Sequence, residues 1–304
     1  MSATFPGALP FGGKPLLPQT PSRYIMTSDG VDLHVVVKGK GTPCLYIHGG
    51  PGCGSYWLEK FSGDTLEQRF QMIYLDQRGS GRSTSPRDGN YTMDRMAGDF
   101  EEVRKVLGIQ QWITLGHSFG GILQMGYAKR YPHAIKGMIM LNCSLKLNES
   151  LTAAIPKACE ILEVTDTKHY TDEAIPLGDR IQDLYGKLRE KDLFWKMAYA
   201  SHRSMEIMDA SFDEIPDRNK DFENFNIMTI KEYGEDYKKA APDIRMPVLF
   251  FYGRTDWLVG PTHYKGINFP EVMLWGSDVG HVASLENKGD LENAIASYQK
   301  KYGL

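Results

Sequence analysis

Short apolar segments rich in β-branched and aromatic residues recur along this chain, and each ends in a turn rich in Gly or Asp. They are LHVVVK (33–38), CLYIHG (44–49), QMIYLD (71–76), WITLGH (112–117), GMIMLN (137–142), PVLFFYG (247–253) and EVMLW (271–275). Several are apolar on both alternating faces, which is typical of central strands covered on both sides. These segments therefore predict the strands of a largely buried sheet.

Helical spacing of apolar residues fills the intervals between these strands. Met93, Phe100 and Val103 share one side of a helix over 93–107, and residues 291–298 repeat the pattern near the C-terminus. Strands that alternate with helices in this way form mostly parallel sheets. We therefore predict an α/β fold, with a mostly parallel twisted sheet and helices on both faces.

The alternation breaks once, over a stretch far too long for a plain connection between two strands. Apolar residues there follow helical spacing over 151–162 and 181–188, and Thr229 and Glu232 have the spacing of a capping box at the start of a third helix. We interpret the stretch as an inserted helical cap. The predicted organisation is an extended Pro- and Gly-rich leader over 1–23, a core over 24–142 and 247–304, and a helical cap over 143–246.

Composition excludes several classes of partner. The 304 residues include 35 Lys and Arg against 38 Asp and Glu, which leaves no basic surface for nucleic acid. The 4 cysteines form no CxxC pair, and no His/Cys cluster has the spacing of a metal site. No apolar run approaches the roughly 18 residues of a membrane span, and the N-terminus lacks the features of a secretory signal. We expect a cytoplasmic protein without a metal or organic cofactor and without a membrane partner.

The stretch WITLGHSFGG runs from an apolar strand directly into a helix. It carries Gly116, Ser118 and Gly120 in the pattern G-x-S-x-G, and at a strand-to-helix turn this pattern is a nucleophile elbow. Such a turn lifts the serine above the sheet, where the first amides of the helix favour negative charge. A dinucleotide site is excluded, because G-x-G-x-x-G would require glycine at position 118. We predict that Ser118 is a nucleophile.

A serine hydroxyl attacks only when a base takes its proton, and a third group must orient that base. In this architecture the chain order is serine, acid, histidine. Asp256 directly follows the strand PVLFFYG, and His281 lies in the loop before the last helix. Asp278 is a rival acid, although its place in the same loop as His281 is typical of a turn former. The predicted triad is Ser118, Asp256 and His281.

Two further loops follow predicted strands. An acyl-transfer site needs backbone N–H groups that bind the developing oxyanion, and we assign these to Phe119, next to the nucleophile, and to Gly50 of HGGPG (48–52). The second loop is DQRGSGRS (76–83). We expect its charged residues, Asp76, Arg78 and Arg82, to pair with one another and to brace the rim of the site.

The motifs HGGPG, DQRGSGRS, GHSFGG, GRTD and GHVASLE together resemble the α/β-hydrolase superfamily, from about residue 24 to the C-terminus. HGGPG combined with DQRGSGRS is most similar to the prolyl iminopeptidase (proline iminopeptidase) family of serine aminopeptidases, which have a helical cap. The resemblance implies release of an N-terminal residue, often proline, from short peptides, without a cofactor. It also carries over the roles of Ser118, Asp256 and His281 as triad, and of Gly50 and Phe119 as oxyanion donors.

The motifs specify the substrate-binding residues less closely than they specify the triad and the oxyanion donors. The resemblance implies that a glutamate of the cap holds the free amino group of the substrate. Glu206, Glu214 and Glu223 lie in that region, and Glu223, between Phe222 and Phe225, is the candidate we select. Aromatic residues around the motifs, Trp57 among them, favour an apolar pocket for the acyl side.

Two alternatives to an aminopeptidase stay open. The elbow has His117 before and Phe119 after the serine, where the family commonly has Gly and Trp, and many esterase-like relatives share the pattern seen here. A carboxylesterase, a lactonase or a C–C bond hydrolase would use the same triad. A non-catalytic ligand receptor is the second alternative, and the complete triad argues against it. Epoxide and haloalkane hydrolases of this fold have Asp at the elbow, so Ser118 excludes that chemistry.

Overall fold

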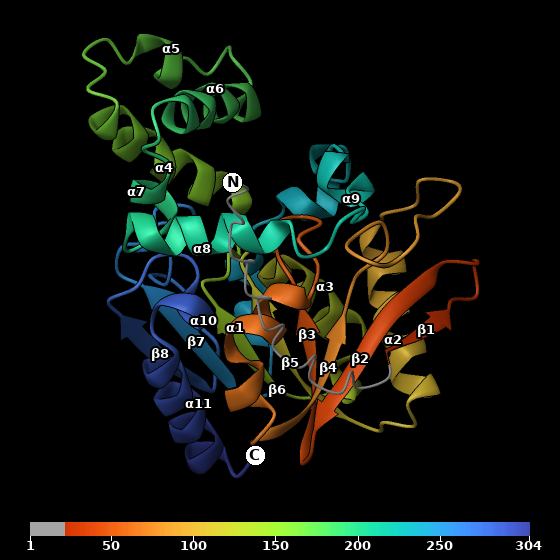
Figure 1. Cartoon of the computed structure of the whole chain (residues 1–304). Coiled ribbons are helices and arrows are strands. Elements are labelled where there is room, and N and C mark those ends of the chain that lie inside the picture. The colour runs from red at the N-terminus through yellow and green to blue at the C-terminus, as the bar shows by residue number, and fades with distance from the viewer. Residues whose placement is uncertain (1–21) are drawn as a thin grey trace, which may run out of the picture.

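An eight-stranded sheet crosses the molecule in the computed structural model, which describes residues 22–304 (Figure 1). Its strand order is β1-β2-β4-β3-β5-β6-β7-β8. The strands are β1 (Arg23–Met26), β2 (Asp32–Gly39), β3 (Thr42–Ile47), β4 (Phe70–Leu75), β5 (Trp112–His117), β6 (Ile135–Leu141), β7 (Val248–Gly253) and β8 (Val272–Ser277). β2 pairs antiparallel with both β1 and β4, and all other pairs are parallel.

This sheet confirms the predicted fold class, and every predicted strand is present within a few residues. β1 is the strand that the apolar pattern missed. It lies at the edge of the sheet, and three of its four side chains are exposed, so it lacks the apolar signal of the central strands. The predicted leader lies almost wholly outside the described residues.

Helices cover both faces of the sheet, each over its own apolar layer. α2 (Met93–Val106) and α3 (Gly120–Arg130) pack on one face, where Phe100 and Ile122 meet Leu45 and Ile73 of the strands. α1 (Tyr56–Leu66), α10 (Ala283–Glu286) and α11 (Lys288–Tyr302) cover the other face. In a parallel sheet enclosed in this way, the loops at the carboxyl ends of the strands are the free positions for a site.

The chain between β6 and β7 forms mostly short helices, and α4 to α9 lie above the sheet in Figure 1. They are α4 (Leu147–Ile161), α5 (Lys168–Thr171), α6 (Leu177–Glu190), α7 (Trp195–Ala198), α8 (His202–Phe212) and α9 (Asp221–Asn224), followed by the 3₁₀ turns η2 (Ile227–Thr229), η3 (Lys231–Gly234) and η4 (Tyr237–Asp243). α4 and α6 bury a separate apolar cluster between them. No helix in residues 22–304 is long and apolar enough to cross a membrane.

The helix predicted to begin at Thr229 is wrong. The Thr229 hydroxyl donates to the Asn226 carbonyl (2.7 Å) and ends a 3₁₀ turn. The following chain forms two further 3₁₀ turns and no α-helix. Gly234 and Pro242 interrupt this stretch, and both residues oppose a continuous helix. The spacing of a capping box was therefore not sufficient here.

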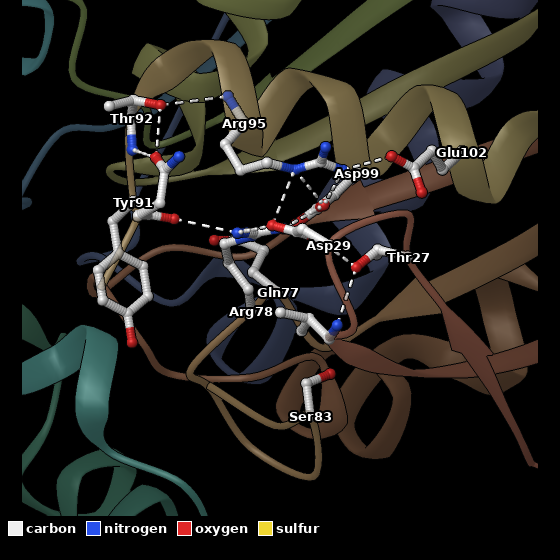
Figure 2. Close-up of polar contacts among 12 residues, drawn as sticks. Thr27, Asp29, Gln77, Arg78, Ser83, Tyr91, Thr92, Arg95, Asp99 and Glu102 are labelled. Atoms are coloured by element: carbon white, nitrogen blue, oxygen red, sulfur yellow. Dashed lines mark hydrogen bonds and ion pairs between the residues drawn. The ribbon is translucent and has the colours of Figure 1, made fainter. Parts of the chain in front are cut away.

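The loop DQRGSGRS (76–83) is fixed by two separate groups of charges. Asp76 pairs with Arg82 (2.7 Å), as predicted. Arg78 does not join them: its fully buried guanidinium binds Asp99 of α2 (2.6 Å) and Asp29 of the β1–β2 turn (2.9 Å) (Figure 2). Both carboxylates lie far from Arg78 in the sequence, so no local pattern indicated this pairing.

Asp99→Ala is expected to lower the free energy of unfolding by about 3–5 kcal/mol, because it leaves the buried Arg78 guanidinium without one of its two carboxylates. Urea unfolding followed by tryptophan fluorescence measures the loss. Glu292→Ala is the matched control, since Glu292 forms a more exposed pair with Arg69 (3.2 Å) and should cost less than about 1 kcal/mol. Equal losses in the two variants would show that burial of Arg78 is not what makes Asp99 important.

Candidate active site

Ser118 lies at the turn between β5 and α3 in a conformation that few residues adopt. Its φ is 56°, in the left-handed region that is costly for a residue with a side chain. The Ser118 N–H donates to the Leu141 carbonyl of β6 (3.2 Å), and the Ser118 carbonyl accepts from the Gly121 N–H (3.0 Å). These bonds hold the strained turn in place. The side chain stays partly exposed, at the N-terminal end of α3.

The two glycines of the elbow have no room for a side chain. A Cβ at Gly120 would lie 2.2 Å from the Ile47 carbonyl oxygen of β3, and one at Gly116 would lie 2.2 Å from the side-chain oxygen of Gln124. Atoms at such separations overlap, and the backbone oxygen of a central strand cannot move aside. The pattern G-x-S-x-G thus follows from how closely α3 packs on the sheet.

Asp256 and His281 form a hydrogen-bonded pair, with 2.9 Å between Asp256 Oδ2 and His281 Nδ1. Asp256 follows β7, and His281 lies in the loop after β8, so two neighbouring strands present them at the same edge of the sheet. Both side chains are buried, with exposed fractions of 2% for Asp256 and 8% for His281. Asp278, the rival acid, is exposed and pairs with Arg254 (2.7 Å).

The Asp256 carboxylate is held in its charged form. Burial by itself raises the pKa of Asp256, but the attraction of His281 and four hydrogen bonds outweigh burial and bring the pKa below its usual value. Besides His281, the donors are the N–H groups of Leu258 (3.0 Å) and Val259 (3.2 Å) and the Asn142 amide (2.9 Å). An ionised carboxylate only accepts, so Nδ1 of His281 carries the proton and Nε2 is free to accept one.

Asn142, at the end of β6, is a site residue that sequence reasoning missed. Its φ is 48°, and its amide donates both to Asp256 Oδ2 (2.9 Å) and to the Gly280 carbonyl (3.0 Å). It therefore ties the loop of Asp256 to the loop of His281. Its position at the end of a strand next to β7 was the available signal.

His117, next to Ser118 in the chain, connects the end of β5 to the loop of His281. Its Nε2 lies 2.8 Å from the His281 carbonyl oxygen, and the two rings are 4.7 Å apart. Burial and the neighbouring His281 lower the pKa of His117 to about 4, so the ring is neutral at pH 7 and donates from Nε2. Within residues 22–304 no hydrogen bond joins the Ser118 hydroxyl to His281. Such bonds are often long before substrate binds.

The loop HGGPG (48–52) lies directly against Ser118. A Cβ at Gly49 would lie 2.7 Å from the Ser118 Cβ, and Gly50 has φ of 116°. The His48 ring anchors this loop by accepting from the Gln77 N–H (3.1 Å). Within the described chain, the N–H groups of Gly50 and Phe119 donate to no protein acceptor. Phe119 is next to Ser118 in the chain, and Gly50 belongs to the loop that packs against it.

The predicted substrate-binding residues occupy different surroundings. Trp57 is 5% exposed, and it lines a small apolar cavity of about 50 Å³ with His117 and Met208. Glu223 of α9 adjoins the glycine loop, because a Cβ at Gly52 would lie 2.8 Å from the Glu223 Cβ. All three glutamates are ion-paired: Glu223 with Arg218 (2.6 Å), Glu206 with Arg203 (3.0 Å) and Glu214 with Lys60.

Known proteins share both sequence and fold with this chain. A proline iminopeptidase of Neisseria meningitidis is 37% identical over 123 residues, which are 39% of this chain and 39% of that protein. A cis-3-alkyl-4-alkyloxetan-2-one decarboxylase of Shewanella oneidensis is 35% identical over 123 residues, 40% of this chain and 38% of that protein. The chain thus matches about two fifths of the length of these relatives.

A solved structure extends the likeness to nearly the whole fold. The proline iminopeptidase-related protein of Thermus thermophilus superposes with a TM-score of 0.75 at 21% identity, over 93% of this chain and 98% of that one. The alpha/beta hydrolase fold family matches residues 42–288, a stretch that contains the elbow, Asp256 and His281. The chain therefore belongs to the alpha/beta hydrolase fold family.

Proposed function

We propose that this chain is a serine hydrolase that works through an acyl-enzyme, with Ser118 as nucleophile, His281 as base and Asp256 as the group that orients the base. The observation that carries the proposal is the buried Asp256–His281 pair (2.9 Å) at the same sheet edge as the strained Ser118 turn. Because the protonated Nδ1 faces the carboxylate, Nε2 is the atom that can accept the serine proton.

The proposed reaction proceeds in two halves. His281 Nε2 takes the proton as Ser118 Oγ forms a bond to the substrate carbonyl carbon, and the N–H groups of Phe119 and Gly50 bind the oxyanion. The tetrahedral species then expels the leaving group, which receives the proton from His281, and water hydrolyses the acyl-enzyme by the same steps. Each oxyanion donor is worth about 3–4 kcal/mol of barrier. No step requires a metal or an organic cofactor.

As substrate we propose a short peptide or a related small molecule with a free N-terminal proline or another small or apolar residue. The motifs HGGPG and DQRGSGRS and the likeness to a proline iminopeptidase support this choice. The contact of Glu223 with Gly52 of the glycine loop supports it as the carboxylate that would bind a substrate ammonium. We further propose that residues 143–246 form the cap that encloses the substrate, and that the protein acts in the cytoplasm, where its free cysteines stay reduced.

One observation favours a second candidate, a carboxylesterase, lactonase or C–C bond hydrolase. The carboxylates of Glu206, Glu214 and Glu223 already pair with cations of the protein. An ammonium group would have to share the Glu223 carboxylate with Arg218, which binds Oε2, whereas an uncharged ester needs no carboxylate. The apolar cavity lined by Trp57 suits the acyl chain of an ester as well as it suits an apolar N-terminal residue.

Proline p-nitroanilide, its N-acetylated form and p-nitrophenyl butyrate distinguish the two candidates. For an aminopeptidase we expect cleavage of the free-amine anilide, little cleavage of the acetylated anilide, and a loss of several orders of magnitude in kcat for Ser118→Ala. Glu223→Gln should then lower kcat/KM for the anilide and leave the ester rate unchanged. Cleavage of the ester alone would assign the protein to the esterase-like branch. Turnover by Ser118→Ala at a rate close to that of the wild type would refute the serine mechanism.

A further inference from the structure

Residues 197–200, at the end of α7 and just after it, are hydrogen-bonded to both loops of the acid–base pair. The Trp257 N–H, next to Asp256, donates to the Met197 carbonyl (2.9 Å). The His281 N–H donates to the Ala198 carbonyl (2.6 Å). The inserted segment between β6 and β7 therefore takes part directly in holding the backbone on which these two side chains stand.

Glu286 of α10 strengthens this junction with a single carboxylate. Its Oε2 accepts from the Gly280 N–H (2.6 Å), next to His281, and its Oε1 accepts from the Ala200 N–H (2.7 Å). Burial raises the pKa of Glu286 in spite of these bonds. The two chains it joins are tightly apposed, since a Cβ at Gly280 would lie 2.5 Å from the Ala198 carbonyl oxygen.

Four backbone groups of the His281 loop, the N–H and C=O groups of Gly280 and His281, thus each bind a different residue. His117 of β5 contacts the His281 carbonyl, and Asn142 at the end of β6 donates to the Gly280 carbonyl. Ala198 and Glu286 bind the two N–H groups of the same residues. His117, Asn142 and Glu286 belong to elements outside the insert, and Ala198 belongs to the insert. Glu286 is the group that binds both the loop and the insert.

We propose that Glu286, together with residues 197–200, is a positioning device for His281, so that the seating of the insert on the sheet sets how well the imidazole reaches Ser118. The inference rests on the proposed function, because it concerns the same base. Glu286 forms no hydrogen bond with Ser118 or the imidazole, and its two hydrogen bonds act through the backbone of the His281 loop. Its carboxylate charge also attracts His281, and Ala200→Pro, which keeps that charge, separates the positioning role from the electrostatic one. The rate with a substrate too small to touch the insert should therefore still depend on Glu286.

Glu286→Gln tests the device with the smallest change in shape. A glutamine has one acceptor oxygen, so it loses one of the two bonds and turns an amide donor toward an N–H group. We expect an about 10- to 100-fold fall in the rate of Ser118 labelling by a small fluorophosphonate and in kcat for p-nitrophenyl acetate, with KM unchanged within about twofold, as for a base displaced by a fraction of an ångström. Thermal unfolding and circular dichroism verify that the variant is folded.

Glu102→Gln is the matched control, because Glu102 of α2 also accepts from a backbone N–H, that of Ser28 (2.7 Å). Its labelling rate should stay at the wild-type level. Ala200→Pro removes the hydrogen bond between Glu286 and the insert, because proline at position 200 has no N–H to donate. Tyr199 already has φ −131° and ψ 152°, the extended conformation required before proline. This variant should also label more slowly.

The outcomes separate the inference from the proposed function. Slower labelling in Glu286→Gln and in Ala200→Pro with an unchanged KM supports the positioning role. A folded Glu286→Gln that labels at the wild-type rate, or that changes KM alone, overturns it and leaves the serine mechanism intact. If Glu286→Gln does not fold, Ala200→Pro decides by the same criteria. A wild-type protein that the fluorophosphonate does not label at Ser118 overturns both.

Discussion

Ser118→Ala is expected to lower kcat by about 10⁴- to 10⁶-fold on whichever of the anilide and ester substrates the wild type cleaves. The substitution removes only the hydroxyl oxygen, and the left-handed turn, the hydrogen bonds to Leu141 and Gly121 and the free N–H groups of Gly50 and Phe119 all remain. The loss therefore reports the covalent step itself. Any residual rate over water would come from binding and the oxyanion donors. Steady-state kinetics and labelling by a fluorophosphonate followed by mass spectrometry measure the effect.

Ser144→Ala is the control for this prediction. Ser144 lies next to the elbow, with its N–H bonded to the Ser118 carbonyl (3.1 Å), but its hydroxyl pairs with Ser150 (2.9 Å) and takes no part in the proposed reaction. Its kcat should stay within about threefold of the wild type. A label found on another residue, or comparable losses in the two variants, would mean that Ser118 is not the nucleophile.

Local patterns were sufficient to predict strands β2 to β8 of the sheet and the order of the site loops. Runs such as PVLFFYG are apolar on both faces because β7 is covered by helices on both sides of the sheet. The residue that follows a parallel strand lies at the edge of the sheet where sites form. Asp256 and His281 could thus be expected near each other without knowledge of any contact. The strained turn at Ser118 was likewise indicated by its two glycines, which the structure explains by close packing of α3.

Residues that act through contacts distant in the sequence could not be found in this way. Asn142 binds the Gly280 carbonyl, Glu286 binds the Ala200 N–H, and Arg78 binds Asp29 and Asp99, yet none of these partners shares a sequence pattern with the residue it meets. Glu286 ends the motif GHVASLE that begins at Gly280, but the motif alone did not indicate that the two residues are hydrogen-bonded. The edge strand β1 and the 3₁₀ turns after Thr229 were missed or predicted wrongly because burial and tertiary packing, not local propensity, decide them. The substrate preference depends on the inserted segment between β6 and β7, and it stays a proposal.

Asp256→Asn is expected to lower kcat by about 10⁴-fold, the size of effect known for this substitution in a serine protease triad. The reason lies in which way the new amide must point. The N–H groups of Leu258 and Val259 donate to Oδ1, so an asparagine has to place its carbonyl oxygen there and its NH₂ at the position of Oδ2. That NH₂ then donates to His281 Nδ1, which moves the ring proton to Nε2. A ring protonated at Nε2 cannot accept the proton of Ser118.

The same geometry predicts a secondary cost and supplies the control. The amide of Asn142 donates to Oδ2 of Asp256, so in Asp256→Asn two NH₂ groups face each other and one buried donor loses its acceptor, which destabilises the fold by about 1–3 kcal/mol. Asp278→Asn changes the exposed rival acid, paired with Arg254, and should leave kcat within about twofold of the wild type. A large loss in Asp278→Asn with normal turnover in Asp256→Asn would reverse the assignment of the acid. The loss of kcat in Asp256→Asn should also become smaller at high pH, where hydroxide can replace the missing base. A loss of kcat that does not change with pH would mean that the defect is not in proton transfer.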